Sequence, residues 1–203
     1  MRATDIERRF GRNRGLLHHA FHAALGRAGR YRAWERVDAS SIERVVFVCD
    51  GNICRSAYAA ARASRQGLHT ESYGLRAQDG ARPPYTALVT AKARGEDLSP
   101  HRAKNISRWA PRDCDLIVAM EPGQALAVAA QARRAGAQLT LAGVWTTDYR
   151  PYIQDPFGLA VEYFDTCFSL LDDAVLALSA ELARASSPKL ADEAQRQGAA
   201  AQA

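Results

Sequence analysis

The chain has 203 residues, of which 47% are hydrophobic and 24% are charged, and this composition is ordinary for a globular protein with one full core. Its formal net charge of +5 lies entirely in residues 1–41, which hold nine arginines and four carboxylates. No apolar run reaches membrane-spanning length, and the N-terminus lacks the uninterrupted apolar segment of a secretory signal. The four cysteines have neither disulfide-framework nor zinc spacing, so we expect a reducing, cytoplasmic location and no bound metal.

The N-terminal arm, residues 1–41, has apolar residues at roughly helical spacing around three histidines, with arginines clustered at each end. Two interpretations of this basic extension remain open. It is either a solvated, disordered segment, because charge-rich termini are often unstructured, or a helix that docks on an acidic partner or an anionic membrane surface. We expect no nucleic-acid partner, because no nucleic-acid recognition fold accompanies the charge.

Residues 42–185 alternate strand-like and helix-like segments, a pattern typical of βαβ units around a parallel sheet. The pattern predicts a small, doubly wound α/β domain in which a four-stranded parallel sheet has helices on both faces. Residues 186–203 begin with Ser-Ser-Pro, are rich in Ala and Gln, and predict a flexible C-terminal tail. Strands are predicted at residues 44–49, 69–74, 115–120 and 138–142, helices at 56–66, 84–94, 122–134 and 162–182, and a short helical turn at 105–109.

The most informative segment joins the first predicted strand to the helix after it and reads Cys49-Asp50-Gly51-Asn52-Ile53-Cys54-Arg55-Ser56. It places a thiol at the carboxyl end of a parallel strand, where doubly wound sheets bind their ligands. The N-terminus of the helix and the guanidinium of Arg55 both favour a thiolate there, and the same groups can hold a tetrahedral oxyanion. A nucleophile and an anion cradle in one loop indicate phosphate-ester chemistry.

This loop resembles the phosphate-binding loop of the low-molecular-weight protein tyrosine phosphatases. The similarity runs from about Val45 to about Leu182 and continues through Ser72-Tyr73-Gly74-Leu75, Ser99-Pro100-His101-Arg102-Ala103, Asp115-Leu116-Ile117-Val118-Ala119-Met120 and Asp155-Pro156-Phe157-Gly158. It implies a cofactor-free phosphatase that acts on a tyrosine-phosphorylated protein. Bacterial members often oppose tyrosine kinases of polysaccharide export, and the stretch 72–77 is more similar to that branch than to the animal enzymes.

Three residues are candidate catalytic groups. We expect Cys49 to attack phosphorus in line and form a cysteinyl-phosphate, while Arg55 binds two phosphate oxygens in a fork that lysine cannot reproduce. The loop contains no acid for the leaving group, so Asp155 is the candidate acid and, later, the base for the attacking water. Asp-Pro alone is a common turn signal, but Asp155 follows the last strand, where side chains can reach over the strand ends, and Pro156 restricts its geometry.

The remaining site predictions concern how the loop holds substrate. We expect its successive N–H groups to form an anion-binding nest in which Gly51 has a positive φ angle. Ser56 is either a helix cap or a donor to the thiolate, and the resemblance favours the second role. The resemblance also implies that Asn52 braces the loop and that His101 hydrogen-bonds it from behind. The predicted substrate-binding residues are Asp50, pointing outward at the rim, Gly51, Asn52, Ile53, Cys54, Ser56 and Phe157, with Ile53, Phe157 and Tyr152 as pocket walls.

Cys54 is also a candidate redox partner, because a disulfide with Cys49 would protect the nucleophile from irreversible oxidation. Two other functions remain open. One is an arsenate reductase of the same fold, but thiol-relay versions need further cysteines near the loop. Cys114 is predicted at the opposite end of the sheet, and residues 121–124 contain no cysteine. The other is a non-catalytic module that binds phosphoproteins, although every residue that the chemistry needs is present.

Overall fold

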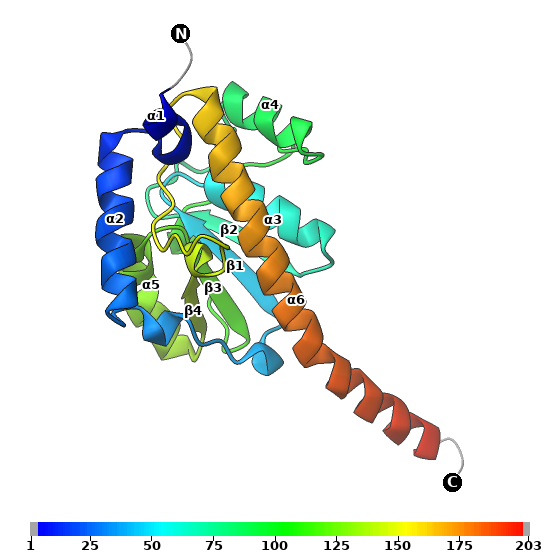
Figure 1. Ribbon diagram of the computed structural model, residues 1–203. Coiled ribbons are helices and arrows are strands. Elements are labelled where there is room, and N and C mark those ends of the chain that lie inside the picture. The colour runs from blue at the N-terminus through cyan, green and yellow to red at the C-terminus, as the bar shows by residue number, and fades with distance from the viewer. Residues whose placement is uncertain (1–3, 201–203) are drawn as a thin grey trace.

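The computed structural model describes the backbone of residues 4–200 and the side chains of residues 4–185. Its centre is a four-stranded parallel sheet in the order β2-β1-β3-β4 (Figure 1). The sheet confirms the predicted fold class and all four predicted strands. Every residue of β1 and of β3 is buried, which explains why both segments are almost continuously apolar in sequence. The strands are β1 (Arg44–Cys49), β2 (Thr70–Gly74), β3 (Asp115–Ala119) and β4 (Gln138–Leu141).

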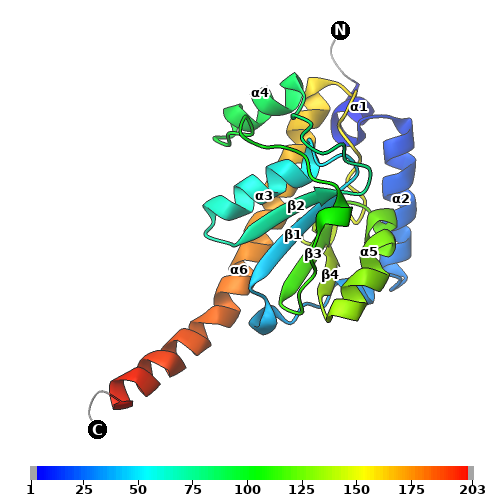
Figure 2. The same cartoon turned by 180° about the vertical axis from the view of Figure 1, so that it is seen from behind.

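Helices cover both faces of the sheet, as predicted. Residues Val45 and Phe47 of β1 pack with α3 (Arg55–Arg65) and α6 (Val161–Ala200), while Val46 and Val48 face the opposite layer, which contains α5 (Pro122–Ala135) (Figure 2). This division follows from the alternation of side chains along a strand. The helix α4 (Tyr85–Ala93) packs against α6. A single 3-10 turn at Ile106–Arg108 matches the predicted helical turn.

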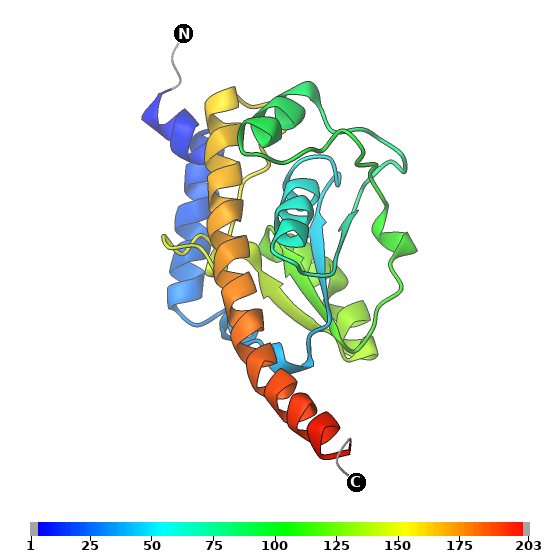
Figure 3. The ribbon, with the colours of Figure 1, turned by 90° about the vertical axis from the view of Figure 1, so that its right-hand side faces the viewer.

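The longest helix, α6, confirms the predicted apolar stripe. It extends to Ala200, well beyond its predicted end at residue 182, and leaves the body of the protein toward the C-terminus (Figures 1 and 3). The flexibility expected of residues 186–203 stays a prediction, because their side chains and residues 201–203 lie outside the described part. No helix in the described residues is long and apolar enough to cross a membrane. The buried stripe consists of Phe164, Phe168, Leu171, Val175 and Leu178.

The N-terminal arm is folded onto the rest of the chain, in contrast to its interpretation as a disordered extension. It contains α1 (Asp5–Phe10) and α2 (Asn13–Arg27), followed by two 3-10 turns. Thr4 and Glu7 form a reciprocal capping box that fixes the start of α1. The helix α1 contacts α6, and α2 runs down the side of the molecule beside α5 (Figures 1 and 2). Tyr31, which follows α2, is buried against the β4 edge of the sheet.

Candidate active site

The loop after β1 lies at the topological switch point of the sheet. The chain leaves β1 toward β2 on one side and later returns to β3 on the other, so the carboxyl end of β1 faces the crevice between the two crossovers. A pocket of about 200 Å³ opens above the loop there. The structure thus brings the predicted nucleophile, acid and loop residues together, although they are far apart in sequence. The lining residues are Cys49, Asp50, Gly51, Ile53, Cys54, Asp155 and Phe157.

The thiol of Cys49 is buried among hydrogen-bond donors at the start of α3. Its Sγ lies 3.0 Å from Ser56 Oγ and accepts the backbone N–H of Asn52 at 3.3 Å. Donors of this kind stabilise negative charge on sulfur, as does the N-terminus of a helix. The cap position of α3 belongs to Cys54, and Ser56 makes no capping hydrogen bond. Ser56 Oγ thus contacts the thiol and does not cap the helix, and its role as donor to a thiolate stays a prediction.

Asn52 is the brace of the loop and also its strained residue. It has the positive φ angle, 52°, whereas Gly51 does not, so the expectation for Gly51 is wrong. Asparagine tolerates the left-handed region, and here its fully buried side chain fixes that conformation. Its amide donates to Ser56 Oγ and Ser72 Oγ, each at 2.9 Å, and its Oδ1 accepts the N–H of Lys104 at 2.8 Å.

His101 supports the loop from behind. Its Nε2 lies 2.7 Å from the carbonyl oxygen of Asn52, the contact that the sequence resemblance implies. Burial lowers the pKa of His101 below its usual value, and the cations of Lys104 and Arg102 lower it further. The hydrogen bond with the Asn52 carbonyl raises this pKa but does not outweigh them. We infer that the imidazole is neutral near pH 7 and carries its proton on Nε2, where it donates to that carbonyl.

Gly74, at the end of β2, makes room for this arrangement. A Cβ at Gly74 would lie 2.6 Å from the carbonyl oxygen of Asp50 and 2.8 Å from the backbone nitrogen of Asn52. The backbone of β2 therefore has to approach the loop more closely than any side chain allows. The neighbouring Ser72 supplies the hydroxyl that receives the Asn52 amide. The sequence resemblance includes this segment but implies no role for either residue.

Arg55 is almost fully buried, with 1% of its surface exposed, and is held by two carboxylates. Its Nη1 pairs with Glu121 and donates to the carbonyl of Ile153, and its Nη2 donates to Asp155 Oδ2 at 2.6 Å. Burial alone would lower the pKa of Arg55, but the charges of Asp155 and Glu121 raise it well above its usual value. Arg55 Nε is buried without a partner among the described atoms and is a free donor for an oxyanion.

Glu121 is a functional residue that sequence reasoning missed. It directly follows the buried β3 segment and Met120, at the carboxyl edge of the sheet. This position after a buried strand, where such sheets bind their ligands, is the sequence feature that could have identified it. Its carboxylate holds one arm of the Arg55 fork in place. A buried guanidinium without such a partner would be costly, so Glu121 is part of what fixes Arg55 at the start of α3.

Asp155 lies above the loop, in the segment between β4 and α6. While its Oδ2 accepts from Arg55, its Oδ1 accepts the N–H of Phe157 at 3.1 Å. The Phe157 ring is 60% exposed at the pocket mouth. Asp50, the acidic residue of the loop, turns its carboxylate to Arg76 at 2.7 and 2.8 Å, and this pairing neutralises its charge at the rim.

A wider cleft of about 440 Å³ adjoins the pocket and shares Asp50, Asp155 and Phe157 with it. Tyr152 lines this cleft rather than the small pocket, so the structure supports Ile53 and Phe157 as walls of the phosphate pocket and places the third candidate farther out. The N-terminal arm reaches the same cleft through Arg12 and Arg14.

The arm braces the segment that carries Asp155. The rings of His18 and His22 stack on Tyr152, with centroids 4.8 and 5.3 Å away. Arg12 donates to the carbonyl of Gly158 at 3.2 Å. Arg150 donates to the carbonyl of Arg9 at 2.9 Å. The arm and the segment 149–159 therefore form one packed unit beside the active site.

Gly11 is a point of close approach in this contact, and its replacement should slow catalysis. The residue has φ +79°, and a Cβ there would lie 2.5 Å from Leu159 Cδ1. We expect Gly11→Ala to displace the arm, loosen the Asp155 segment and lower kcat on aryl phosphates about tenfold. The reason is that even a small misplacement of a catalytic group lowers the rate of the chemical step. Hydrogen exchange of residues 149–159 should rise in parallel. Gly29→Ala is the matched control, since Gly29 has φ +83° but faces only the flexible side chain of Arg32. Equal kcat and equal exchange in the two variants would contradict the brace.

A thiol and a carboxyl group that line one small pocket, with a buried guanidinium held by that carboxyl group, are typical of the class of cysteine-dependent phosphatases. Residues 44–187 match the family model of the low molecular weight phosphotyrosine protein phosphatases, and the chain belongs to this family. It is a low-molecular-weight protein-tyrosine-phosphatase of the bacterial type, as the sequence resemblance predicted.

Similar proteins agree with this assignment. The low molecular weight protein-tyrosine-phosphatase Wzb of Escherichia coli K12 is 33% identical over 130 residues, which cover 63% of this chain and 87% of Wzb. The probable phosphatase AmsI of Erwinia amylovora is 29% identical over 135 residues, or 66% and 92% of the two chains. The structure of Wzb from E. coli K30 with sulphate has a TM-score of 0.61 at 25% identity and covers 70% of this chain and 99% of Wzb. The YwlE arginine phosphatase of Geobacillus stearothermophilus, at 24% identity and a TM-score of 0.63 over 72% and 96% of the chains, shows a shared fold.

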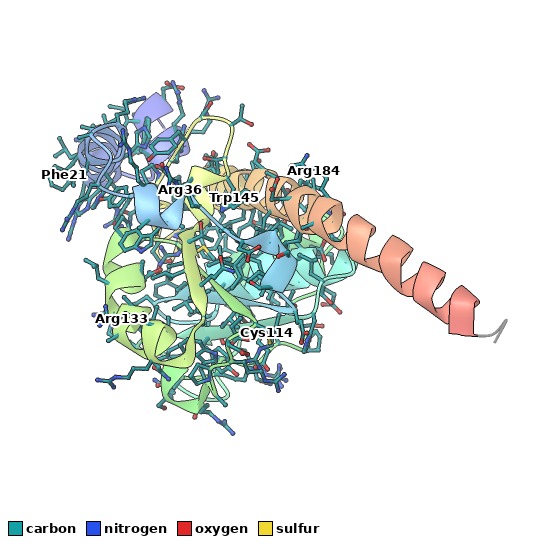
Figure 4. The ribbon with its side chains drawn as sticks, turned by 90° about the horizontal axis from the view of Figure 1, so that it is seen from below. Phe21, Arg36, Cys114, Arg133, Trp145 and Arg184 are labelled. Carbon is teal, nitrogen blue, oxygen red and sulfur yellow. The ribbon has the colours of Figure 1, made fainter. Side chains whose placement is uncertain are left out.

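The cysteines outside the loop bear on the redox prediction. Cys114 directly precedes β3, at the opposite end of the sheet, and Figure 4 looks onto that end. Cys167 of α6, for which the sequence pattern predicts no role, is fully buried and packs in the same apolar cluster as Cys49 and Cys54. Burial raises the pKa of both Cys54 and Cys167, so neither is a ready thiolate.

We expect mild peroxide to inactivate the enzyme reversibly through a Cys49–Cys54 disulfide. The thiolate of Cys49 would be oxidised to a sulfenic acid, and Cys54 would displace water from it. Peptide mapping should find this pair in the wild type and in Cys167→Ala. Reductant should restore the wild type better than Cys54→Ala. A Cys54–Cys167 linkage, or equal recovery of the two proteins, would refute a protective role for Cys54.

Proposed function

We propose that the chain hydrolyses phosphotyrosine in a protein substrate, with Cys49 as nucleophile, Arg55 as phosphate clamp and Asp155 as acid and base. The observation that carries the proposal is the pocket that Cys49 and Asp155 both line, together with the hydrogen bond that Arg55 donates to Asp155. No metal or cofactor takes part in this mechanism.

The reaction proceeds in two displacements at phosphorus. In the first, Cys49 Sγ forms a bond to phosphorus while the bond to the tyrosine oxygen breaks, and Asp155 gives its proton to that oxygen. In the second, water attacks the cysteinyl-phosphate, Asp155 takes the proton of the water, and the thiolate leaves. Arg55 binds two phosphate oxygens in both steps. We expect the entering phosphate to compete with Asp155 for Arg55 Nη2 and so to release the carboxyl group for proton transfer.

The pocket favours an aryl phosphate over other phosphate monoesters. Its walls above the loop are the apolar side chains of Ile53 and Phe157, which suit a phenyl ring. An aryl group also extends the phosphate far enough to reach the buried thiol.

The physiological partner that we propose is a bacterial tyrosine kinase of polysaccharide export, acting as the phosphoprotein substrate in the cytoplasm. The similarity of the chain to bacterial relatives such as Wzb and AmsI supports this choice. The arm supplies a second contact, with an acidic partner or an anionic membrane surface. Its outer face exposes Leu17 (68%) and Phe21 (60%), and Figure 4 shows Phe21 at the outer edge of the arm. Residues 8–34 contain seven arginines and no carboxylate.

Steady-state hydrolysis of matched phosphopeptides tests the proposed function. We expect turnover of phosphotyrosine in the presence of a chelator, with kcat/KM about 100-fold or more above that for phosphoserine and phosphoarginine. Binding without turnover would indicate the phosphoprotein-binding module instead. Arsenate reduction coupled to thioredoxin, in the absence of phosphotyrosine hydrolysis, would indicate the arsenate reductase.

A further inference from the structure

The arm contributes two cations to the substrate cleft, and neither has a carboxylate partner among the described residues. The cleft that adjoins the phosphate pocket is lined by four arginines and three carboxylates. Arg76 pairs with Asp50, and Arg55 pairs with both Glu121 and Asp155. Arg12 and Arg14 form no ion pair with a carboxylate in residues 4–185, since Arg12 donates to the Gly158 carbonyl and Arg14 to His18 Nε2 at 3.4 Å.

These two arginines stand at defined positions beside the pocket. Both are exposed and flank Asn13, the first residue of α2. The start of this helix is fixed by close contacts, because a Cβ at Gly15 would lie 1.9 Å from the carbonyl oxygen of Phe10 and 3.4 Å from Gln154 Cγ. The stacking of His18 on Tyr152 anchors the next turn. The guanidinium groups are therefore presented toward the cleft by a fixed helix.

The cleft is where the neighbours of a bound phosphotyrosine must lie. It shares Asp50, Asp155 and Phe157 with the phosphate pocket, so a polypeptide whose phosphotyrosine enters that pocket places its next residues in the cleft. Exposed arginines that have no carboxylate partner of their own bind carboxylates in the fork geometry of the guanidinium. Complementary charge at the rim of a site sets specificity and the rate of encounter more than raw affinity.

We propose that Arg12 and Arg14 form a subsite for an acidic side chain, aspartate or glutamate, within about two residues of the phosphotyrosine in the substrate; the reach follows from a spacing of roughly 3.3 Å per extended residue. This inference rests on the proposed function and adds a substrate preference to it. The phosphate itself is bound by the loop and Arg55, so the subsite acts on the sequence around the phosphotyrosine.

A pair of isosteric peptide series tests the subsite. Each phosphotyrosine peptide carries one glutamate at a position from two residues before to two residues after the phosphotyrosine, and its partner carries glutamine there. We expect the wild type to prefer glutamate over glutamine at one or more of these positions. In Arg12→Gln/Arg14→Gln this ratio of kcat/KM values should fall about threefold to tenfold, as for the loss of two exposed ion pairs. The effect should appear in KM and should weaken with salt.

Two further variants separate the subsite from an effect of net charge and from an effect of charge without the guanidinium fork. Arg30→Gln/Arg36→Gln removes the same charge from the same arm, at residues that do not line the cleft, and should retain the preference. Arg12→Lys/Arg14→Lys keeps the charge without the fork and should retain part of it. Circular dichroism and thermal melting confirm that each variant is folded.

Several results would overturn the subsite. One is an equal fall of kcat/KM on all peptides in Arg12→Gln/Arg14→Gln, which would mean general attraction of phosphate or a loosened Asp155 segment, since Arg12 also donates to the Gly158 carbonyl. Another is the same loss in the Arg30/Arg36 control, which would mean an effect of net charge. A third is a wild type without any preference for glutamate. Hydrolysis of p-nitrophenyl phosphate separates these outcomes from failure of the proposed function, since wild-type enzyme that hydrolyses it but ignores flanking charge refutes the subsite alone.

Discussion

Replacing Cys49 with serine should abolish turnover and leave the oxyanion site intact. The hydroxyl of serine is a far weaker nucleophile than the Cys49 sulfur, which lies beside Ser56, the Asn52 N–H and the start of α3. We expect kcat on p-nitrophenyl phosphate to fall by at least about 1,000-fold, as for the loss of other covalent nucleophiles. The dissociation constant for phosphate, measured by calorimetry, should change little, because Arg55 and the loop N–H groups remain.

Cys114→Ser is the matched control for this experiment. It makes the same chemical change at the opposite end of the sheet and should keep wild-type turnover. A Cys49→Ser variant that retains a substantial rate would remove the thiol from the mechanism. Loss of phosphate binding together with turnover, in a folded variant, would instead show that the substitution had disrupted the loop.

Replacing Asp155 with asparagine should slow the enzyme according to the leaving group. A positioned general acid contributes about 100- to 10,000-fold to proton transfer, and phenols of high pKa need the proton most. We therefore expect a loss of this size on phenyl phosphate and a much smaller loss on p-nitrophenyl phosphate. The logarithm of kcat plotted against leaving-group pKa should be steeper for the variant than for the wild type.

The interpretation of this series requires two comparisons. Asp173→Asn removes an exposed carboxylate of α6 and should behave as wild type. Asp155 also accepts from Arg55, so the variant could lose binding as well as acid catalysis. Equal slowing across the whole series would assign Asp155 to the positioning of Arg55 and would take away its role as acid.

The strands and the loop were predictable because local signals agree with the fold. The almost continuously apolar β1 and β3 lie in the centre of the sheet, and the glycine- and asparagine-containing loop follows directly from β1. Asp155 was identified from the resemblance, and the structure places it in the pocket with Cys49. Each of these residues has a signature within a few positions of the chain.

Contacts between distant segments left no such signature. Glu121 pairs with Arg55 across 66 residues, and only the register of β1 with β3 brings them together. The sequence of the arm predicts a helix but does not show which face of it packs on the protein, because α2 has apolar residues on both its covered and its exposed side. The choice of Asn52 rather than Gly51 for the positive φ angle depends on its buried partners Ser56 and Ser72, which cannot be read locally.

Direct detection of the phosphoenzyme tests the central claim that this chain is a phosphatase acting through a cysteinyl-phosphate. The enzyme is mixed with a phosphotyrosine peptide labelled with ³²P, quenched within one turnover and digested. The label should lie on the peptide that contains Cys49 and should be absent from Cys49→Ser. It should accumulate under conditions in which the attack of water on the cysteinyl-phosphate is the slow step. Sustained hydrolysis of the peptide with no label on Cys49 at any quench time, or with the label on another residue, would contradict the account.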